Sequence, residues 1–151
     1  MHSLLFISAE DLTTRSRTTT YIRHMKKVIF VEDNYDFSSF VSMVIQRKFP
    51  DCQILTFPAS KEAIAAVTSL HADFDVLLLD GHLGYADTGM NVLDILTPKQ
   101  IERVVVTSGS REFATKCEER GTKFCMEKGF AGVLGTELFE HIIDTLKEVT
   151  G

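Results

Sequence analysis

Short runs of apolar residues alternate along the chain with segments in which apolar residues recur at helical spacing. Continuous apolar runs occupy residues 28–31, 76–79 and 104–106. Runs of this length without a polar residue are typical of strands buried on both faces of a parallel sheet. Residues 53–57 alternate between polar and apolar side chains, which predicts an edge strand, and residues 123–127 predict a fifth strand.

Three segments between these strands have the spacing of amphipathic helices. In NYDFSSFVSMVIQRKF the apolar residues recur at i, i+3, i+4, i+7 and i+8, with Asn34 available as the N-cap and Pro50 as the terminator. SKEAIAAVTSL has an apolar face behind Ser60 as the cap, and TELFEHIIDTLKEVTG has one behind Thr136. Each of these helices is predicted to pack one apolar face against the sheet.

Two further segments predict shorter or more polar helices. GMNVLDIL stops before Pro98, and REFATKCEERG contains few apolar residues, so it predicts a mostly exposed helix that ends at Gly121. The resulting order is five repeats of strand then helix. It predicts an α/β fold, a doubly wound five-stranded parallel sheet, (βα)5, with helices on both faces and right-handed crossovers.

Composition limits the class of protein. The 151 residues are enough for one ordinary domain, and 44% hydrophobic with 25% charged residues is typical of a globular protein without a membrane span. The net charge of −5 argues against nucleic acid as a partner. The three cysteines are odd in number and form no C-x-x-C pair, which suits a reducing compartment and predicts a cytoplasmic protein.

The N-terminal part of the chain differs from the rest. Residues 10–24 are rich in Ser, Thr and charge and show no helical or strand period. This composition predicts that residues 1–24 are a disordered or loosely attached extension. The folded domain is then residues 25–151, and Met25 is a candidate for the natural start.

Polar residues follow the predicted strands directly. In an open parallel sheet the working site lies at the carboxyl ends of the strands, where the strand order reverses. The candidates at this rim are Glu32 and Asp33, Asp80, Thr107 and Ser108, and Lys128. Carboxylates a few ångströms apart repel by roughly 4 kcal/mol per pair at an effective dielectric constant near 20, so the cluster needs a cation. Oxygen ligands select a hard divalent ion, and a site with few carboxylates that keeps its waters suits Mg²⁺.

The same cluster predicts phosphoryl chemistry. Mg²⁺ screens the charge of an incoming phosphoryl group and allows a carboxylate to attack phosphorus as a nucleophile. Asp80 is the best candidate for that nucleophile. The ammonium group of Lys128 and the hydroxyl of Ser108 are expected to hold other phosphoryl oxygens.

The residues around this rim resemble the receiver domains of response regulators, and the chain is similar to the chemotaxis-type single-domain receivers. The resemblance extends over residues 26–149. Its matching pieces, in family order and at family-like spacing, are VIFVEDN, DVLLLDGHL, the pair Thr88 and Gly89, VVVTSGS and FCMEKGF. Any one piece alone is a weak signal, and the five together are a strong one.

The resemblance implies a flavodoxin-like fold and a phosphoprotein that takes part in a two-component system or phosphorelay. A histidine kinase or phosphotransfer protein would phosphorylate Asp80, and Mg²⁺ would be held by Glu32, Asp33, Asp80 and the backbone carbonyl of His82. The protein would accept and lose a phosphoryl group on its own aspartate, so it is not expected to be a turnover enzyme. Because no output domain follows Gly151, the signal is expected to pass to another, unknown protein.

The chain departs from the family pattern at three positions. Gly84 stands where a proline is usual, in a loop about one residue longer than in the family, and Gly129 stands where a cis-proline commonly follows the lysine. The aromatic switch position on the fifth strand holds Cys125, with Phe124 one place away.

Alternative functions come from other classes of protein. A phosphatase of the haloacid-dehalogenase type requires a second aspartate two residues after the first, and this position is His82. A topoisomerase-primase type metal domain would combine Glu32 with a D-x-D motif, which is missing for the same reason. The alternative that stays open is a receiver-like module that binds another protein without being phosphorylated.

Overall fold

The computed structural model describes residues 25–69, 73–126 and 136–151, with the side chains of the last helix described from Glu140 onward. Strands and helices alternate along the chain in the order β1 Lys27–Val31, α2 Tyr35–Lys48, β2 Gln53–Phe57, α3 Ser60–Thr68, β3 Val76–Leu79, α4 Met90–Leu93, α5 Pro98–Ile101, β4 Val104–Val106, α6 Arg111–Glu119, β5 Phe124–Cys125 and α7 Thr136–Thr150. The predicted repeat of strand then helix is confirmed.

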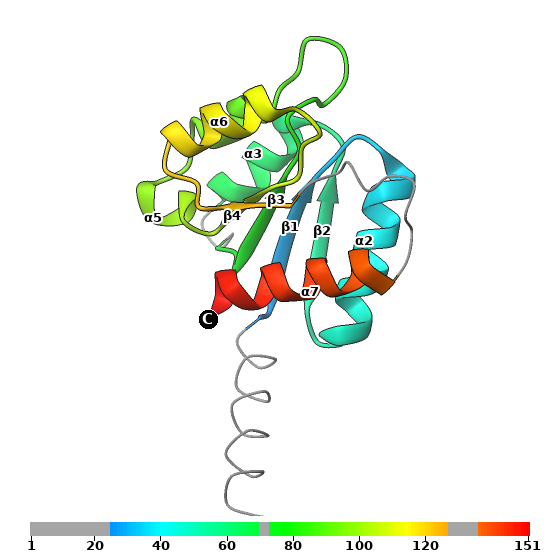
Figure 1. Cartoon of the computed structure of the whole chain (residues 1–151). Helices are drawn as coiled ribbons and strands as arrows, with labels where there is room; N and C mark the ends of the chain where they lie inside the picture. The colour runs from blue at the N-terminus through cyan, green and yellow to red at the C-terminus, as the bar shows by residue number, and fades with distance from the viewer. Residues whose placement is uncertain (1–24, 70–72, 127–135) are drawn as a thin grey trace, which may run out of the picture.

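The described strands form one parallel five-stranded sheet in the order β2-β1-β3-β4-β5. Helices cover both faces of this sheet (Figure 1), so the predicted doubly wound, flavodoxin-like architecture is confirmed. The chain first runs outward from β1 to β2 and then crosses back to β3 on the other side of β1. The strand order therefore reverses between β1 and β3, which is where sheets of this kind bind ligands.

The apolar strands divide their side chains between two cores. The core under α2 and α7 takes up Val28, Phe30, Leu78 and Val105, whereas the core under α3 to α6 takes up Ile29, Val31, Leu77, Leu79, Val104 and Val106. Successive side chains of a strand point to opposite faces, so a continuous apolar run is required wherever both faces are covered. This alternation also determines the face reached by the first polar residue after each strand.

The helix boundaries follow local capping signals in one case and a distant contact in another. The Oδ1 of Asn34 accepts a hydrogen bond from the backbone N–H of Phe37 at 3.0 Å, and α2 ends before Pro50, both as predicted. Ser60 is the first residue of α3 and not its cap, because the N-cap position is Ala59, which has no side-chain acceptor. The acceptor for the Ser60 N–H comes from Asp87, far along the chain.

A short helix after Pro98 was not predicted. Thr97 and Gln100 form a reciprocal capping box around Pro98, with the Gln100 N–H donating to Thr97 Oγ1 at 3.2 Å and the Thr97 N–H donating to Gln100 Oε1 at 2.9 Å. Proline at the first position and a Thr-x-x-Gln cap favour the start of a helix. The sequence TPKQ therefore carried a signal for α5 that the interpretation of Pro98 as a terminator overlooked.

Helix α6 is polar and mostly exposed, as predicted, and only its few apolar residues are buried. Phe113 and Cys117 are buried against the sheet, and Ala114 packs beside them. The helix ends at Glu119 with Arg120 as its C-cap, and Gly121 follows with φ +108°, the left-handed conformation expected after a helix C-terminus. The few apolar residues of α6 thus form one narrow buried stripe.

Some predictions lie outside the described residues. They concern the extension 1–24 and the end of the fifth strand at Glu127, Lys128 and Gly129. Thr136, predicted to cap the last helix, is the first residue of α7. Within the described ranges, no helix is both long and apolar enough to cross a membrane.

Candidate functional site

Three carboxylates meet at the carboxyl ends of β1 and β3. The Glu32 N–H donates to the Phe57 carbonyl at 3.0 Å, and the Asp80 N–H donates to the Val31 carbonyl at 3.0 Å, so both residues continue the parallel ladder beyond the strands. One carboxylate oxygen each of Glu32, Asp33 and Asp80 lies within 4.8 Å of the others. The structure brings these three sequence-predicted residues together at the point where the strand order reverses.

Burial strengthens the repulsion between the carboxylates of this acidic cluster. Glu32 is 3% exposed and Asp80 is 5% exposed, whereas Asp33 faces solvent. Like charges at such separations, with two of them screened from water, repel strongly unless a cation or a proton lies between them. An all-oxygen donor set with one side open to water fits a hard cation such as Mg²⁺, which retains several water ligands.

The Asp80 carboxylate holds the backbone of the next residue in place. The Gly81 N–H donates to Asp80 Oδ1 at 2.8 Å, which turns the chain sharply out of β3. His82 is exposed, and its backbone pairs with Thr88 across the loop that follows. The backbone carbonyl of His82 was predicted to be a metal ligand. It lies in the loop just after Asp80, which is closed by the pairing of His82 with Thr88.

A buried hydroxyl lies beside the phosphoacceptor candidate. The Thr107 N–H donates to the Leu79 carbonyl at 2.8 Å, which places Thr107 next to Asp80 in the register of β3 and β4. Leu78 and Val105 face α2 and α7, so strand alternation turns the side chains of Asp80 and Thr107 to that same face. Thr107 is fully buried, and its hydroxyl has no hydrogen-bond partner among the described residues.

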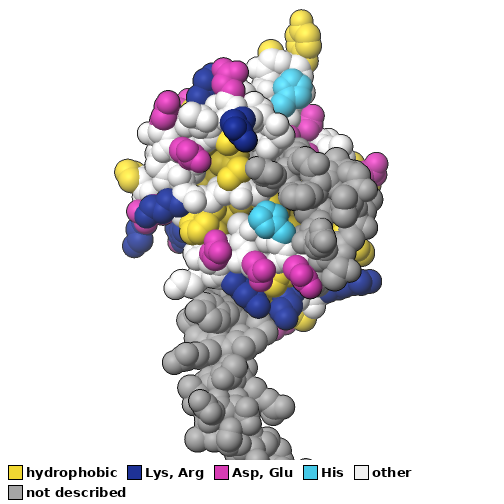
Figure 2. All heavy atoms as spheres, viewed as in Figure 1, with side chains coloured by type: hydrophobic (Ala, Val, Ile, Leu, Met, Phe, Trp, Pro, Cys, Tyr) yellow, Lys and Arg dark blue, Asp and Glu magenta, His cyan; other side chains and the backbone are white. Residues whose placement is uncertain are grey.

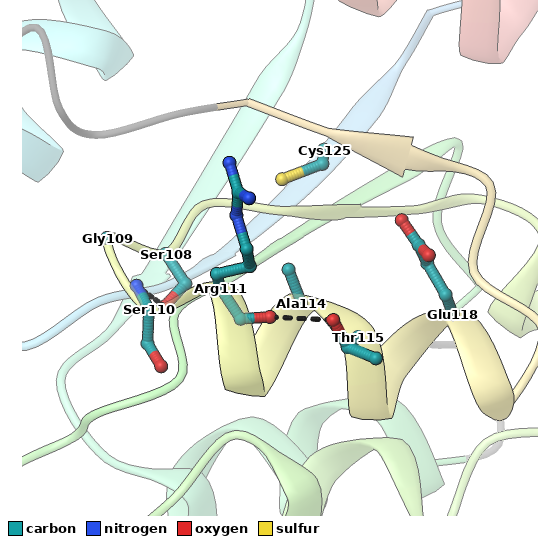
Figure 3. Close-up of a pocket in the computed structure, with 8 residues that line it drawn as sticks. All are labelled: Ser108, Gly109, Ser110, Arg111, Ala114, Thr115, Glu118 and Cys125. Atoms are coloured by element: carbon teal, nitrogen blue, oxygen red, sulfur yellow. Dashed lines mark hydrogen bonds between the residues drawn. The ribbon is translucent and has the colours of Figure 1, made fainter.

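Ser108, the predicted hydroxyl ligand, follows one position later and so points to the opposite face. Its Oγ accepts a hydrogen bond from the Ser110 N–H at 3.0 Å at the start of α6. Ser108 also lines a cavity of about 480 Å³ between α6 and β5 (Figure 3). The assignment of Ser108 stays a prediction, whereas register and burial favour Thr107 as the hydroxyl near Asp80. The alternation of side chains along the strand, counted from Val106, would already have indicated in the sequence that Thr107 is the hydroxyl near Asp80.

Cys125 occupies the position of the family's aromatic switch residue on the fifth strand, and it lines the same cavity. Cys125 is exposed and lies across from Arg111 and Glu118 of α6 (Figure 3). Phe124 packs against the core under α2 and α7, on the opposite face of β5. The aromatic ring of β5 and the cavity beside α6 are therefore separated by the sheet.

The remaining predicted site residue, Lys128, lies outside the described residues, as does Gly129. The described part of β5 ends at Cys125, and the Met126 N–H donates to the Val106 carbonyl at 2.7 Å. The parallel pairing of β5 with β4 thus continues to the same rim on which Thr107 lies.

Solved structures of receiver domains share this fold. The chain is 23% identical to the receiver domain of NtrX from Brucella abortus, with a TM-score of 0.65 over 82% of this chain and 97% of that one. It is 20% identical to the phosphorylated cyanobacterial phytochrome response regulator RcpA, with a TM-score of 0.63 over 83% and 91% of the two chains. It is also 20% identical to the Mn²⁺-bound form of the response regulator Rcp1, with a TM-score of 0.60 over 83% and 90%.

No family model matches the chain, and no curated protein sequence matches it. The fold is that of response-regulator receiver domains, as the sequence resemblance implied.

Proposed function

We propose that the protein is a receiver of a two-component system or phosphorelay, which accepts a phosphoryl group on Asp80. The observation that carries this proposal is the convergence of Glu32, Asp33 and Asp80 oxygens within 4.8 Å at the topological switch point of a receiver fold. The donor is a histidine kinase or a phosphotransfer protein, the compartment is the cytoplasm, and the signal passes to a further protein by direct binding.

The chemistry assigns a separate task to each residue. A bound Mg²⁺ ion would supply positive charge to the phosphoryl oxygens. Glu32 and Asp33 would hold that ion, with Asp80 and the His82 carbonyl as further ligands. An Asp80 oxygen attacks phosphorus in line with the phosphohistidine nitrogen; the P–N bond breaks, and the imidazole nitrogen keeps the electron pair and takes a proton. The product is an aspartyl phosphate on Asp80.

The hydroxyl of Thr107 has a further role in this proposal. A buried hydroxyl without a partner costs free energy, and it is retained where it serves function. Because Thr107 lies beside Asp80, its hydroxyl can donate to a phosphoryl oxygen on that carboxylate. Ser108 and Lys128 stay predicted phosphoryl contacts.

Acetyl phosphate with Mg²⁺ tests the proposal without a known kinase. We expect the mass of one phosphoryl group on the intact protein, stable in acid and lost in base. Asp80→Asn should abolish the addition, and Asp94→Asn, which changes an exposed carboxylate just after α4, should not. Undiminished addition to the Asp80 variant would show that another residue is phosphorylated.

The alternative function is a receiver-like binding module that works without phosphate. The joint presence of Glu32, Asp33 and Asp80 in one cluster speaks against it. If the wild-type protein neither takes up phosphate from acetyl phosphate nor binds beryllofluoride with Mg²⁺, this alternative is favoured.

A further inference from the structure

The carboxylate of Asp87 is held by donors from two helices. Its Oδ2 accepts from the Ser60 backbone N–H at 2.8 Å, and its Oδ1 accepts from Ser60 Oγ at 2.6 Å and from Asn91 Nδ2 at 3.0 Å. Ser60 lies 27 residues earlier in the chain and is buried. Asp87 thus joins the loop after β3 to the first turn of α3.

This contact replaces the local cap that α3 lacks. Ala59 occupies the N-cap position and has no side-chain acceptor for the first N–H groups of the helix. A carboxylate near a helix N-terminus is also favoured by the helix dipole. Partial burial acts to raise the pKa of Asp87, but the hydrogen bonds from Ser60 and Asn91 outweigh it and lower the pKa, so the carboxylate is ionised at neutral pH.

The loop between Gly81 and Gly89 is closed by its own backbone hydrogen bonds. The Leu83 N–H donates to the Asp87 carbonyl at 3.2 Å, and the Gly89 N–H donates to the Gly81 carbonyl at 3.2 Å. His82 pairs with Thr88 in an antiparallel bridge between these bonds. Whatever fixes Asp87 therefore also fixes the segment that leaves Asp80.

The loop needs such a restraint because its turn is strained. Ala86 has φ +61°, a region that residues with a side chain rarely adopt, whereas Gly84 adopts its φ of +94° without strain because it has no side chain. Strained conformations persist only where surrounding contacts hold them. Two contacts anchor this turn: the buried side chain of Leu83 on one side and the carboxylate of Asp87 on the other.

We propose that Asp87 is a positioning residue, whose carboxylate, held by Ser60, keeps the loop after Asp80 in the conformation that presents the His82 backbone carbonyl to the metal. Asp87 itself touches neither metal nor phosphoryl group. The inference rests on the proposed function, since it concerns the same site. According to this proposal, the affinity for the metal depends on the contact between Asp87 and Ser60. That contact joins the loop to α3 and lies outside the acidic cluster.

Three variants of the full-length protein test this role: Asp87→Ala, Ser60→Ala and, as the matched control, Asp94→Ala. Asp94 is an acidic residue just after the next helix, where it pairs with Arg120 at the surface. In the metal-free Asp87→Ala protein, we expect the amides of Leu83 and Gly89 to exchange with solvent about tenfold faster, while amides of β3 keep their protection. In a calorimetric titration with MgCl₂, the dissociation constant should rise about tenfold, as is typical when a residue that supports a metal ligand is removed.

Ser60→Ala retains the backbone donor and should shift both quantities in the same direction by less. This variant keeps the test informative if Asp87→Ala does not fold. Wild-type exchange and wild-type Mg²⁺ affinity in both variants would overturn the proposal, and so would uniformly faster exchange through the sheet, which indicates general destabilisation. Neither measurement uses a phosphodonor. A wild-type protein that binds Mg²⁺ but takes up no phosphate would therefore contradict the proposed function and leave the decision about Asp87 intact.

Discussion

The ring of Phe113 on α6 lies directly against Gly81, the residue after Asp80. A Cβ atom built on Gly81 would lie 2.6 Å from two carbons of that ring, and one built on Gly89 would lie 3.0 Å from the ring tip and 2.2 Å from the Asp80 carbonyl oxygen. Both ends of the loop after β3 thus pass beneath one aromatic side chain. Helix α6 is in direct contact with the loop that follows the phosphoacceptor candidate Asp80.

The first prediction follows from this contact. Gly81→Ala should lower the free energy of unfolding by about 1–3 kcal/mol, because the buried ring cannot move away without disturbing the core around it. Urea unfolding measures the loss. Gly109→Ala is the control, since nothing lies within 4 Å of its added Cβ. Replacing the ring by a smaller side chain, Phe113→Leu, should recover part of the stability lost in the Gly81→Ala protein. Equal stability of the Gly81→Ala and Gly109→Ala proteins would contradict the prediction.

The second prediction separates the two hydroxyls that follow β4. Thr107→Val keeps the shape and removes a buried hydroxyl without a partner, so it should leave the metal-free protein as stable or more stable by about 1 kcal/mol. The same variant should bind beryllofluoride with Mg²⁺ more weakly than the wild type. Ser108→Ala should have the smaller effect on beryllofluoride binding, because its hydroxyl faces α6. Fluorine NMR of bound beryllofluoride gives the ranking, and the reverse order would restore Ser108 as the phosphoryl contact.

The third prediction concerns the acidic cluster with and without metal. Asp33→Asn removes one of three neighbouring charges, so the variant should melt at a higher temperature than the wild type in EDTA. Adding MgCl₂ should raise the melting temperature of the wild type, since a ligand that binds only the folded state stabilises it. The Asp33→Asn protein should gain much less. A wild-type melting temperature that does not respond to Mg²⁺ would mean that the folded protein does not bind the ion, and an equal gain in the Asp33→Asn protein would place the metal site elsewhere.

The fourth prediction concerns thiol reactivity. Burial raises the pKa of Cys52 to about 11 and that of Cys117 to about 12, whereas Cys125 is exposed in the cavity beside α6. The thiolate is the reactive form, so at pH 8 one thiol per chain should react rapidly with a disulfide reagent under native conditions. Cys125→Ser should remove this rapid phase. Rapid reaction of Cys117 in the native protein would mean that α6 opens readily, and rapid reaction of Cys52 would mean that the core under α2 and α7 does.

Acidic and basic side chains are mixed over the face of the molecule drawn in Figure 2. Figure 2 shows Asp and Glu side chains interspersed with Lys and Arg over the described part of one face, without a continuous basic patch there. The described residues on this face therefore form no extended basic site for a phosphate backbone. Binding of nucleic acid is not part of the proposed function.

The amino-acid sequence by itself determined the strands, most of the helices and the acidic cluster. Continuous aliphatic runs such as 76–79 are strands because both faces of a covered parallel sheet require apolar side chains. Asn34 caps α2 through a bond to a residue three positions away, which a local pattern can encode. Glu32, Asp33 and Asp80 were predicted to meet because the carboxyl ends of neighbouring parallel strands share one edge.

The tertiary structure decided the contacts that depend on register and on close approach of distant backbone. Ser60 looks like a cap in the sequence, but its N–H and hydroxyl both bind Asp87, 27 residues away. Phe113 looks like an isolated aromatic on a polar helix, but it is buried because Gly81 has no side chain to keep it away. Neither partner lies within a helical turn or along the same strand, so no local periodicity records the contact. Chain packing alone brings these pairs together.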